Sequence, residues 1–240
     1  MTSKADVRAG LNGVDGVVHL AAVLGWHGEP AEDFLQVNTV GTWRLLHEAR
    51  RQSISRFVFV SSIDVLGVFK GDRTPDYLPL DDNHPCYPNT PYALSKHLAE
   101  AACTDYWTAH GLETVVLRPP GVWSEETYET IKAHRRDDPS YEWSPFWEYG
   151  AFLDRRDLAS AIERALIVEY PGPLPFGVAA DDINSSAGTS LEWAARIHPD
   201  VPVQGRGNFE DVPFRTLLDN GRAKDVLGWS PVNSWRPAHA

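Results

Sequence analysis

Four short, mostly apolar runs constrain the fold of this chain more than any other feature of its sequence. Stretches with helical periodicity or turn-forming residues stand between them. Strands that are apolar on both faces are typical of a parallel sheet with helices on each side. We therefore predict an α/β fold with a doubly wound, Rossmann-like parallel sheet. The predicted strands are 16–22, 57–60, 114–117 and 176–180.

Helices are predicted between and after these strands. The clearest begins at Thr90, whose side chain can cap a helix, because Pro91 suits the first helical position. Gly111 is placed to end this helix, since glycine readily adopts the left-handed conformation of a helix C-terminus. The predicted helices are 31–52, 91–110, 154–168 and 217–227.

Charge and cysteine content exclude several classes of function. The net charge of −11 argues against binding to nucleic acid and to anionic membrane surfaces. The two cysteines, Cys86 and Cys103, have no CxxC or Cys/His spacing, so we expect no disulfide framework and no metal site. No apolar run approaches membrane length, and a reducing cytoplasm is the expected location.

The carboxyl ends of the predicted strands are where we expect the chemistry, because parallel α/β sheets bind ligands there. Tyr92 and Lys96 are four apart on a predicted helix, so their side chains share a face. A nearby ammonium favours the phenolate of a tyrosine and lowers its pKa from about 10. Ser62 follows a neighbouring strand and can orient a substrate oxygen. This set suits carbonyl/alcohol interconversion with a hydride from a cofactor, although Tyr/Lys pairs also occur on solvated helix faces.

Seven segments, in order, resemble the extended short-chain dehydrogenase/reductase family, also called the NAD-dependent epimerase/dehydratase family. The resemblance runs from about Asp15 to the end of the chain. The segments are VDGVVHLAA, VNTVGTWRLLHEAR, FVFVSSIDVLG, TPYALSKHLAE, VVLRPPGVW, FLDRRDLASAIERAL and RAKDVLGWSP.

The resemblance implies a catalytic Ser62, an acid/base Tyr92, and a Lys96 that lowers the pKa of Tyr92 and holds the nicotinamide ribose. It implies NAD or NADP as the cofactor, without distinguishing the two. It also implies that Asn38 lies behind the active site. The residues implied to lie beside the cofactor are Leu20, Ala21, Ala22, Asn38, Val60, Tyr92, Lys96, Pro119 and Pro120.

One departure from the family pattern is large. The family opens with a strand, a Gly-rich turn and a helix that together hold the pyrophosphate. We identify no such unit in this chain, whose first 16 residues are similar to the helix before the family's fourth strand. The fold is therefore expected to be N-terminally truncated. Three explanations stay open: a start downstream of the real one, a complete but cofactor-poor protein, or a sheet completed by another chain.

The resemblance also divides the chain into a core and a small C-terminal substrate lobe. The predicted core is 1–121 with 152–180, and the predicted lobe is 122–151 with 181–240. Residues 122–151 leave little room for a nucleotide diphosphate, so we favour a small sugar-like substrate such as a sugar acid or lactol. We expect an NAD(P)-dependent oxidoreductase or epimerase/dehydratase. The alternatives are a nucleotide-sugar epimerase/dehydratase and a non-catalytic binding or regulatory protein. Helix-mediated homodimers are frequent in the family.

Other side chains in and around the predicted lobe have two interpretations each. Arg155 and Arg156 could clamp a carboxylate or phosphate, or pair with Asp154 or Asp157 on the helix surface, which we favour. For His19 we favour a buried structural role over a catalytic one. A run of aromatic residues could line the substrate site or form the core of a small lid: Trp123, Tyr128, Tyr141, Trp143, Phe146, Trp147 and Tyr149.

Overall fold

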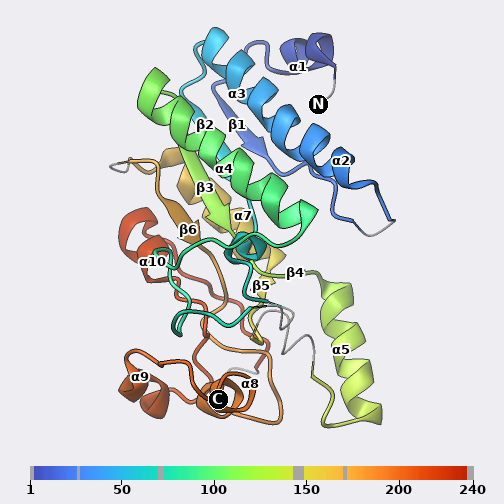
Figure 1. Cartoon of the computed structure of the whole chain (residues 1–240), viewed down its shortest axis with the longest axis vertical. Helices are drawn as coiled ribbons and strands as arrows, with labels where there is room; N and C mark the ends of the chain where they lie inside the picture. The colour runs from blue at the N-terminus through green and yellow to red at the C-terminus, as the bar shows by residue number, and fades with distance from the viewer. Residues whose placement is uncertain (1–2, 26–27, 70–72, 143–148, 170–171, 237–240) are drawn as a thin grey trace. The chain divides into compact units, whose positions relative to one another are not determined.

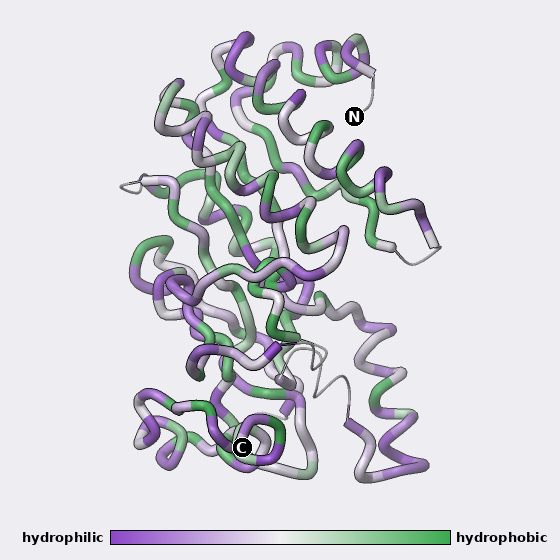
Figure 2. The backbone as a smooth tube through the Cα atoms, in the orientation of Figure 1, coloured by the Kyte–Doolittle hydropathy of each residue, from purple (hydrophilic) through white to green (hydrophobic). Residues whose placement is uncertain are grey.

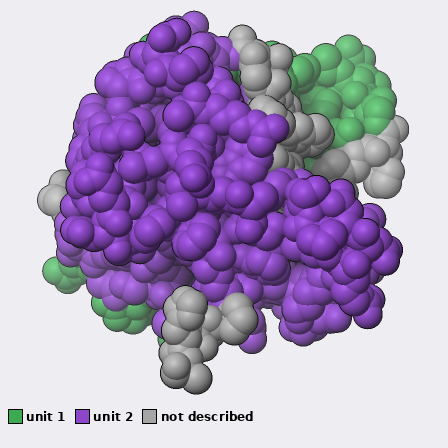
Figure 3. Space-filling model, turned by 90° about the horizontal axis from the view of Figure 1, so that it is seen from below, with its two compact units in different colours: residues 1–67, 86–118, 162–176 green, residues 68–85, 119–161, 177–240 purple. Residues whose placement is uncertain are grey.

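The chain forms two compact units, which Figure 3 colours green and purple. The computed structural model describes residues 3–25, 28–69, 73–142, 149–169 and 172–236. The domain boundaries expected from the sequence stay a prediction. Unit 1 comprises 1–67, 86–118 and 162–176, and unit 2 comprises 68–85, 119–161 and 177–240.

Unit 1 is built on a four-stranded sheet (Figure 1). Val18 lies opposite Val58, and Val58 lies opposite Val115, in a ladder whose first three strands run parallel. The middle strand is buried along its whole length, which explains why its sequence is apolar without alternation. Hydrophobic segments follow these strands in Figure 2. In spatial order the strands are β1 (Gly16–His19), β2 (Arg56–Val60), β3 (Glu113–Arg118) and β6 (Pro175–Gly177).

Helices cover both faces of this sheet, as predicted for a doubly wound fold. On one face, buried side chains such as Leu46, Phe57 and Cys103 share one hydrophobic core. On the other face, a Cβ atom built on Gly16 would lie 3.5 Å from Leu166. The first face is covered by α1 (Lys4–Gly10), α3 (Gly41–Arg51) and α4 (Pro91–His110), and the second by the end of α7 (Arg155–Ile167).

The predicted helix at 91–110 is confirmed at both ends. Thr90 Oγ1 accepts a hydrogen bond from the backbone N–H of Ala93 at 3.1 Å. Pro91 occupies the first helical turn, and Gly111 ends the helix with φ 68°. The capping threonine, the first-turn proline and the terminal glycine therefore stand where the sequence predicted them.

The predicted helix at 31–52 is not one regular α-helix. It consists of α2 (Ala31–Asp33), a π-helical segment η1 (Phe34–Val40) and α3. Within η1, the Asn38 side chain bonds to both backbone groups of Val23 and to Ser95. Wide π-helical turns of this kind frequently accompany functional sites.

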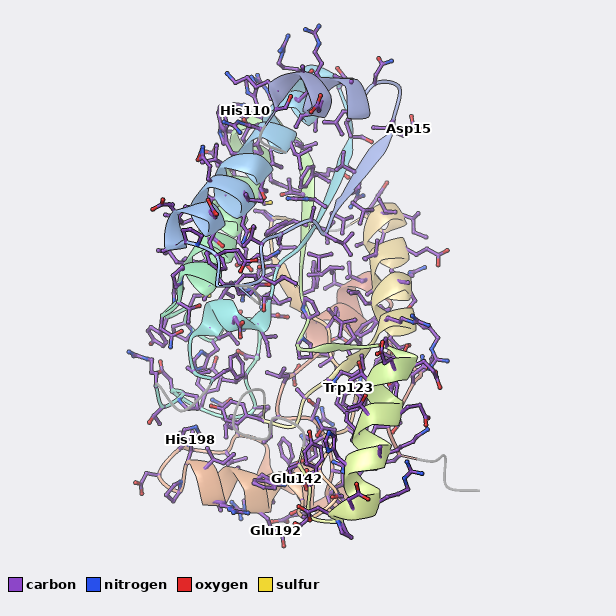
Figure 4. The ribbon with its side chains drawn as sticks, turned by 90° about the vertical axis from the view of Figure 1, so that its right-hand side faces the viewer. Asp15, His110, Trp123, Glu142, Glu192 and His198 are labelled. Carbon is purple, nitrogen blue, oxygen red and sulfur yellow. The ribbon has the colours of Figure 1, made fainter. Side chains whose placement is uncertain are left out.

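Predicted strand 16–22 follows Asp15, which Figure 4 labels, and ends three residues early, at His19. The backbone N–H and C=O of Val23 bond to the side chain of Asn38, at 2.8 and 3.0 Å. The chain beyond His19 is therefore fixed by a side chain of η1 rather than by a neighbouring strand.

Unit 2 has a small aromatic core. Trp123 and Phe152 lie with ring centroids 4.6 Å apart, and Tyr128 packs edge-on against Trp123. This supports the interpretation of Trp123, Tyr128 and Tyr141 as lid core; Trp143, Phe146 and Trp147 lie outside the described residues. The elements are β4 (Val122–Trp123), α5 (Glu125–Asp137), β5 (Leu153–Asp154), α8 (Ser190–Ile197), α9 (Arg206–Asp211), α10 (Gly221–Leu227) and the start of α7.

Two predicted elements in the second half of the chain are shorter than expected. Strand 176–180 ends at Gly177, whose N–H donates to Asp82 Oδ1 at 2.6 Å instead of to a strand. Helix 217–227 begins only at Gly221. The backbone of 217–219 instead pairs with Leu80, which donates to Leu217 O and accepts from Asp219 N–H, both at 2.8 Å. Because these long-range hydrogen bonds use the backbone groups of 217–219, the helix does not extend back to residue 217.

Charged side chains fix the start of α7 and the C-terminal segment within unit 2. Arg156 pairs with Asp154 at 2.7 Å, as we favoured over a substrate clamp. The buried Asp157 accepts hydrogen bonds from the backbone N–H groups of Val232 and Asn233 at 3.1 and 3.0 Å. In the described part of the chain, no helix has both the length and the apolarity needed to cross a membrane.

Candidate functional site

Lys96 is the charged group at the centre of the candidate site. Its side chain is 3% exposed, and Nζ donates a hydrogen bond to Val60 O, at the end of β2, at 2.8 Å. Nζ also lies 4.9 Å from the centre of the Phe59 ring. Burial lowers the pKa of Lys96 to about 8, because the ammonium loses hydration, while Glu100 partly opposes the shift.

Tyr92 lies one helical turn before Lys96 and is half-buried. The Lys96 Nζ atom is 5.8 Å from the centroid of the Tyr92 ring. The ring of Phe34, in η1, contacts Tyr92 edge-on at 6.5 Å. The structure therefore brings Tyr92, Lys96 and the end of β2 together, as the i,i+4 spacing predicted.

Ser62 is placed by a short turn that follows β2. Its Oγ atom accepts from the backbone N–H of Asp64 at 3.1 Å and caps η2 (Ile63–Leu66), which packs against α4. Gly67 ends this turn with φ 64°, and a Cβ atom there would lie 1.6 Å from Tyr87 O. Only glycine can occupy that position, so the turn that presents Ser62 is held against the segment leading into α4.

Asn38 ties the segment after β1 to α4. Its amide bonds to the backbone of Val23 and donates to Ser95 Oγ at 3.0 Å. The segment so held includes the exposed Leu20 and Ala21 and the half-buried Ala22. These are three of the residues expected beside a cofactor.

The remaining two predicted cofactor contacts, Pro119 and Pro120, are buried and belong to unit 2. Their contact with a cofactor stays a prediction. Among the described residues, no group of histidine, cysteine, aspartate and glutamate side chains could hold a metal ion.

Gly10, Gly13 and Gly16 have the G-x-x-G-x-x-G spacing of a phosphate-binding turn. The structure shows that this pattern is not a phosphate-binding turn. Gly10 ends α1, and Gly16 begins β1, so the glycines join a helix to a strand. A phosphate loop has the opposite order, because its bound phosphate needs the N–H groups at the start of a helix.

A buried ion pair that the sequence analysis did not predict lies one helical turn beyond Lys96 on α4. Arg118, the last residue of β3, donates to Glu100 through Nε at 3.0 Å and through Nη2 at 2.6 Å. Both side chains are less than a tenth exposed. The sequence offered one signal: Glu100 follows Lys96 by four residues and so shares its helix face.

His19 has the buried structural role expected of it. It is 4% exposed, and its Nε2 atom lies 2.9 Å from Thr42 Oγ1. The Thr42 hydroxyl donates to Asn38 O, so His19 Nε2 must be the donor in the pair that it forms with Thr42. Burial, and then the charge of Lys96, lower the pKa of His19 to about 4.

We expect His19 to make the protein less stable in mild acid. Its pKa is about 4 when folded and about 6.5 when unfolded, so the unfolded chain binds the proton first. The stability it contributes is complete above pH 6.5 and is lost as the pH falls toward 4, by about 3 kcal/mol. Urea unfolding across this range should show a flatter pH dependence in His19→Gln than in the wild type. His110→Gln, at an exposed position on α4, is the control and should keep the wild-type slope.

The fold and the Tyr92–Lys96 pair define a Rossmann-like protein of the short-chain dehydrogenase/reductase type. Residues 1–139 match the model of the NAD dependent epimerase/dehydratase family. The UDP-glucose 4-epimerase of Rhizobium meliloti (strain 1021) is 35% identical over 250 residues, which cover 90% of this chain and 72% of the relative. The chain therefore belongs to the NAD-dependent epimerase/dehydratase family.

Two further comparisons extend the similarity. The uronate dehydrogenase of Pseudomonas syringae pv. tomato is 31% identical over 118 residues, covering 49% of this chain and 40% of the relative. A short-chain dehydrogenase/reductase superfamily protein from Agrobacterium tumefaciens, solved with bound NAD, aligns with a TM-score of 0.70 and 21% identity. That alignment covers 98% of this chain and 80% of the other. The chain spans 38% of the length of one curated relative that it matches and 73% of the length of another.

Proposed function

We propose that this protein is an NAD(P)-dependent oxidoreductase or epimerase/dehydratase that acts on a carbonyl or hydroxyl of a small sugar-like substrate. The observation that carries the proposal is the buried ammonium of Lys96, 5.8 Å from the ring centre of Tyr92, at the end of β2. Buried cations with a lowered pKa cluster at functional sites. Family membership supports the same reading.

The proton chemistry follows from the three side chains. Tyr92 would give its hydroxyl proton to a substrate carbonyl oxygen, or take the proton from a substrate hydroxyl in the reverse direction. The charge of Lys96 favours the phenolate that remains after the proton has left. Ser62, on the turn after β2, would hydrogen-bond the same substrate oxygen and orient it.

The residues around Lys96 fit the nicotinamide half of a cofactor. The Lys96 cation and the Tyr92 hydroxyl can hold ribose hydroxyls, and the small side chains of Ala21 and Ala22 leave the backbone after β1 accessible. When bound, the nicotinamide supplies or accepts the hydride. Val60 adds a backbone carbonyl that fixes the Lys96 ammonium at 2.8 Å.

Two of the relatives bear on the class of substrate. Uronate dehydrogenase supports a sugar acid, in line with the short segment 122–151 of the predicted lobe. The UDP-glucose 4-epimerase of Rhizobium meliloti supports the alternative of a nucleotide-sugar substrate. Turnover of glucuronate without turnover of UDP-glucose or UDP-glucuronate would favour the sugar acid, and the reverse result would favour the nucleotide sugar.

A non-catalytic binding or regulatory protein is the second candidate. It is favoured by the order of Gly10, Gly13 and Gly16, which follow a helix and precede a strand. Fluorescence titration with NADH and NADPH distinguishes the two proposals. We expect saturable binding of one nucleotide by the wild type and weaker binding by Lys96→Met, because the ribose loses its cationic partner. Absence of binding by the wild type would favour the non-catalytic candidate.

We also propose that the protein forms a homodimer through helix α4 of unit 1. Leu94 and Leu98 are four apart on α4 and are 39% and 41% exposed. Neighbouring apolar side chains that are exposed on one helix face can form part of a protein–protein contact. Light scattering after size-exclusion chromatography should give a dimer for the wild type and a monomer for Leu94→Asp combined with Leu98→Asp. A wild-type monomer at high concentration contradicts the proposal.

A further inference from the structure

A groove lies between helices α1 and α3 of unit 1, which pack side by side (Figure 1). Its cavity volume is about 390 Å³, which is within the range of small-molecule sites. None of Ser62, Tyr92 and Lys96 lines it. The lining residues are Lys4, Ala5, Val7, Arg8, Trp43, Arg44, His47, Glu48 and Arg51.

The charge of this groove is opposite to that of the protein. Four of its lining side chains are cations and one is a carboxylate, whereas the whole chain has a net charge of −11. The carboxylate of Glu48 is largely buried and lies 3.9 Å from Arg8 and 3.3 Å from Arg51. It therefore holds two guanidinium groups at the groove. Guanidinium groups are well suited to phosphate oxygens.

An aromatic wall lines the same groove. Trp43 is 47% exposed, which is unusual for so large an apolar side chain. Its ring stacks on His47 with centroids 5.3 Å apart and an angle of 16° between the planes. His47 is fixed in turn by Tyr106, whose hydroxyl lies 3.3 Å from Nδ1. A flat, fixed ring system with exposed surface is suited to stack on a planar ligand.

We propose that this groove binds a nucleotide, with the base against Trp43 and the phosphate groups against Arg8 and Arg51. A cationic rim alone would take any anion, and an aromatic wall alone would take any planar ring. Their combination in one cavity selects a ligand that joins both. The inference does not rest on the proposed catalytic function, since it uses a different surface of unit 1.

Isothermal titration calorimetry with ADP, pyrophosphate and adenosine tests the proposal. We expect ADP to bind saturably and more tightly than pyrophosphate or adenosine, because only ADP has both the ring and the phosphates. Arg8→Glu should weaken ADP binding by about tenfold or more, since it replaces a charge-assisted contact with repulsion. Trp43→Ala should weaken ADP but leave pyrophosphate unchanged.

Arg206→Glu is the matched control. The Arg206 side chain is 64% exposed and lies 3.8 Å from Glu210, whereas Arg8 is 68% exposed and lies 3.9 Å from Glu48. Arg206 belongs to α9 in unit 2 and does not line the groove. It should bind ADP like the wild type. Lys4→Glu, at an exposed position, provides a second test if Arg8→Glu does not fold, which circular dichroism will show. No ADP binding, or ADP binding unchanged in the groove variants, overturns the proposal, as does equal affinity for pyrophosphate and ADP.

Discussion

Replacing Tyr92 with phenylalanine is expected to lower kcat by about 10²- to 10⁴-fold, the usual contribution of a positioned acid/base group. The substitution removes one hydroxyl and keeps the ring that packs against Phe34 at 6.5 Å. The fold should therefore change little, and the cofactor should still bind through the Lys96 contact to its ribose. The measurement is NAD(P)H absorbance if the wild type oxidises glucuronate, or chromatographic detection of the product sugar if it converts UDP-glucose or UDP-glucuronate, because epimerisation leaves no net reduced cofactor.

Tyr77→Phe is the matched control for this experiment. It also removes one tyrosine hydroxyl, but that hydroxyl bonds to Asp81 at 2.7 Å in unit 2. Its kcat should stay at the wild-type value. Normal turnover by Tyr92→Phe would show that Tyr92 does not transfer the proton and would remove the basis of the proposed site.

Replacing Glu100 with alanine is expected to cost about 3–5 kcal/mol of stability, because it leaves the Arg118 guanidinium buried without its carboxylate. Both hydrogen bonds of the pair are lost, at 3.0 and 2.6 Å, and both side chains are less than a tenth exposed. The free energy of unfolding of each protein can be measured by urea denaturation followed by tryptophan fluorescence.

Two further variants test whether the loss of stability comes from the unpaired buried charge. Glu100→Leu with Arg118→Met removes both charges of the pair and should recover much of the loss, because no guanidinium is left buried without its carboxylate. Glu129→Ala breaks an exposed pair with Lys132 on α5 and should leave the unfolding midpoint unchanged. If Glu100→Ala were as stable as the wild type, the pair would not be an important part of the core.

The proximity of Tyr92 and Lys96 and the parallel sheet could be predicted from the sequence because both depend on local spacing. Tyr92 and Lys96 meet because residues four apart on any helix share a face. The strands around Val58 and Val115 are recognisable because a strand buried on both sides must be apolar throughout. Thr90, Pro91 and Gly111 mark helix ends through their own side chains and backbone preferences.

The features that the sequence left undetermined depend on contacts between distant residues. Asn38 reaches Val23 and Ser95, and Arg118 finds Glu100, only after the sheet has brought their elements together. Residues 217–219 have a helical pattern, yet they pair with Leu80, because backbone bonds to a distant segment satisfy the same groups.

The sequence by itself determined the family, the sheet and the Tyr92–Lys96 pair of this protein. Only the tertiary structure decided that Lys96 is buried against Val60, that the glycines at 10, 13 and 16 follow a helix, and that cations from α1 and α3 share one groove. The physical reason is that the periodicity of a sequence indicates only the face of a helix or strand on which a residue lies. Which faces contact one another, and therefore which side chains are buried or clustered, depends on the packing of the whole unit.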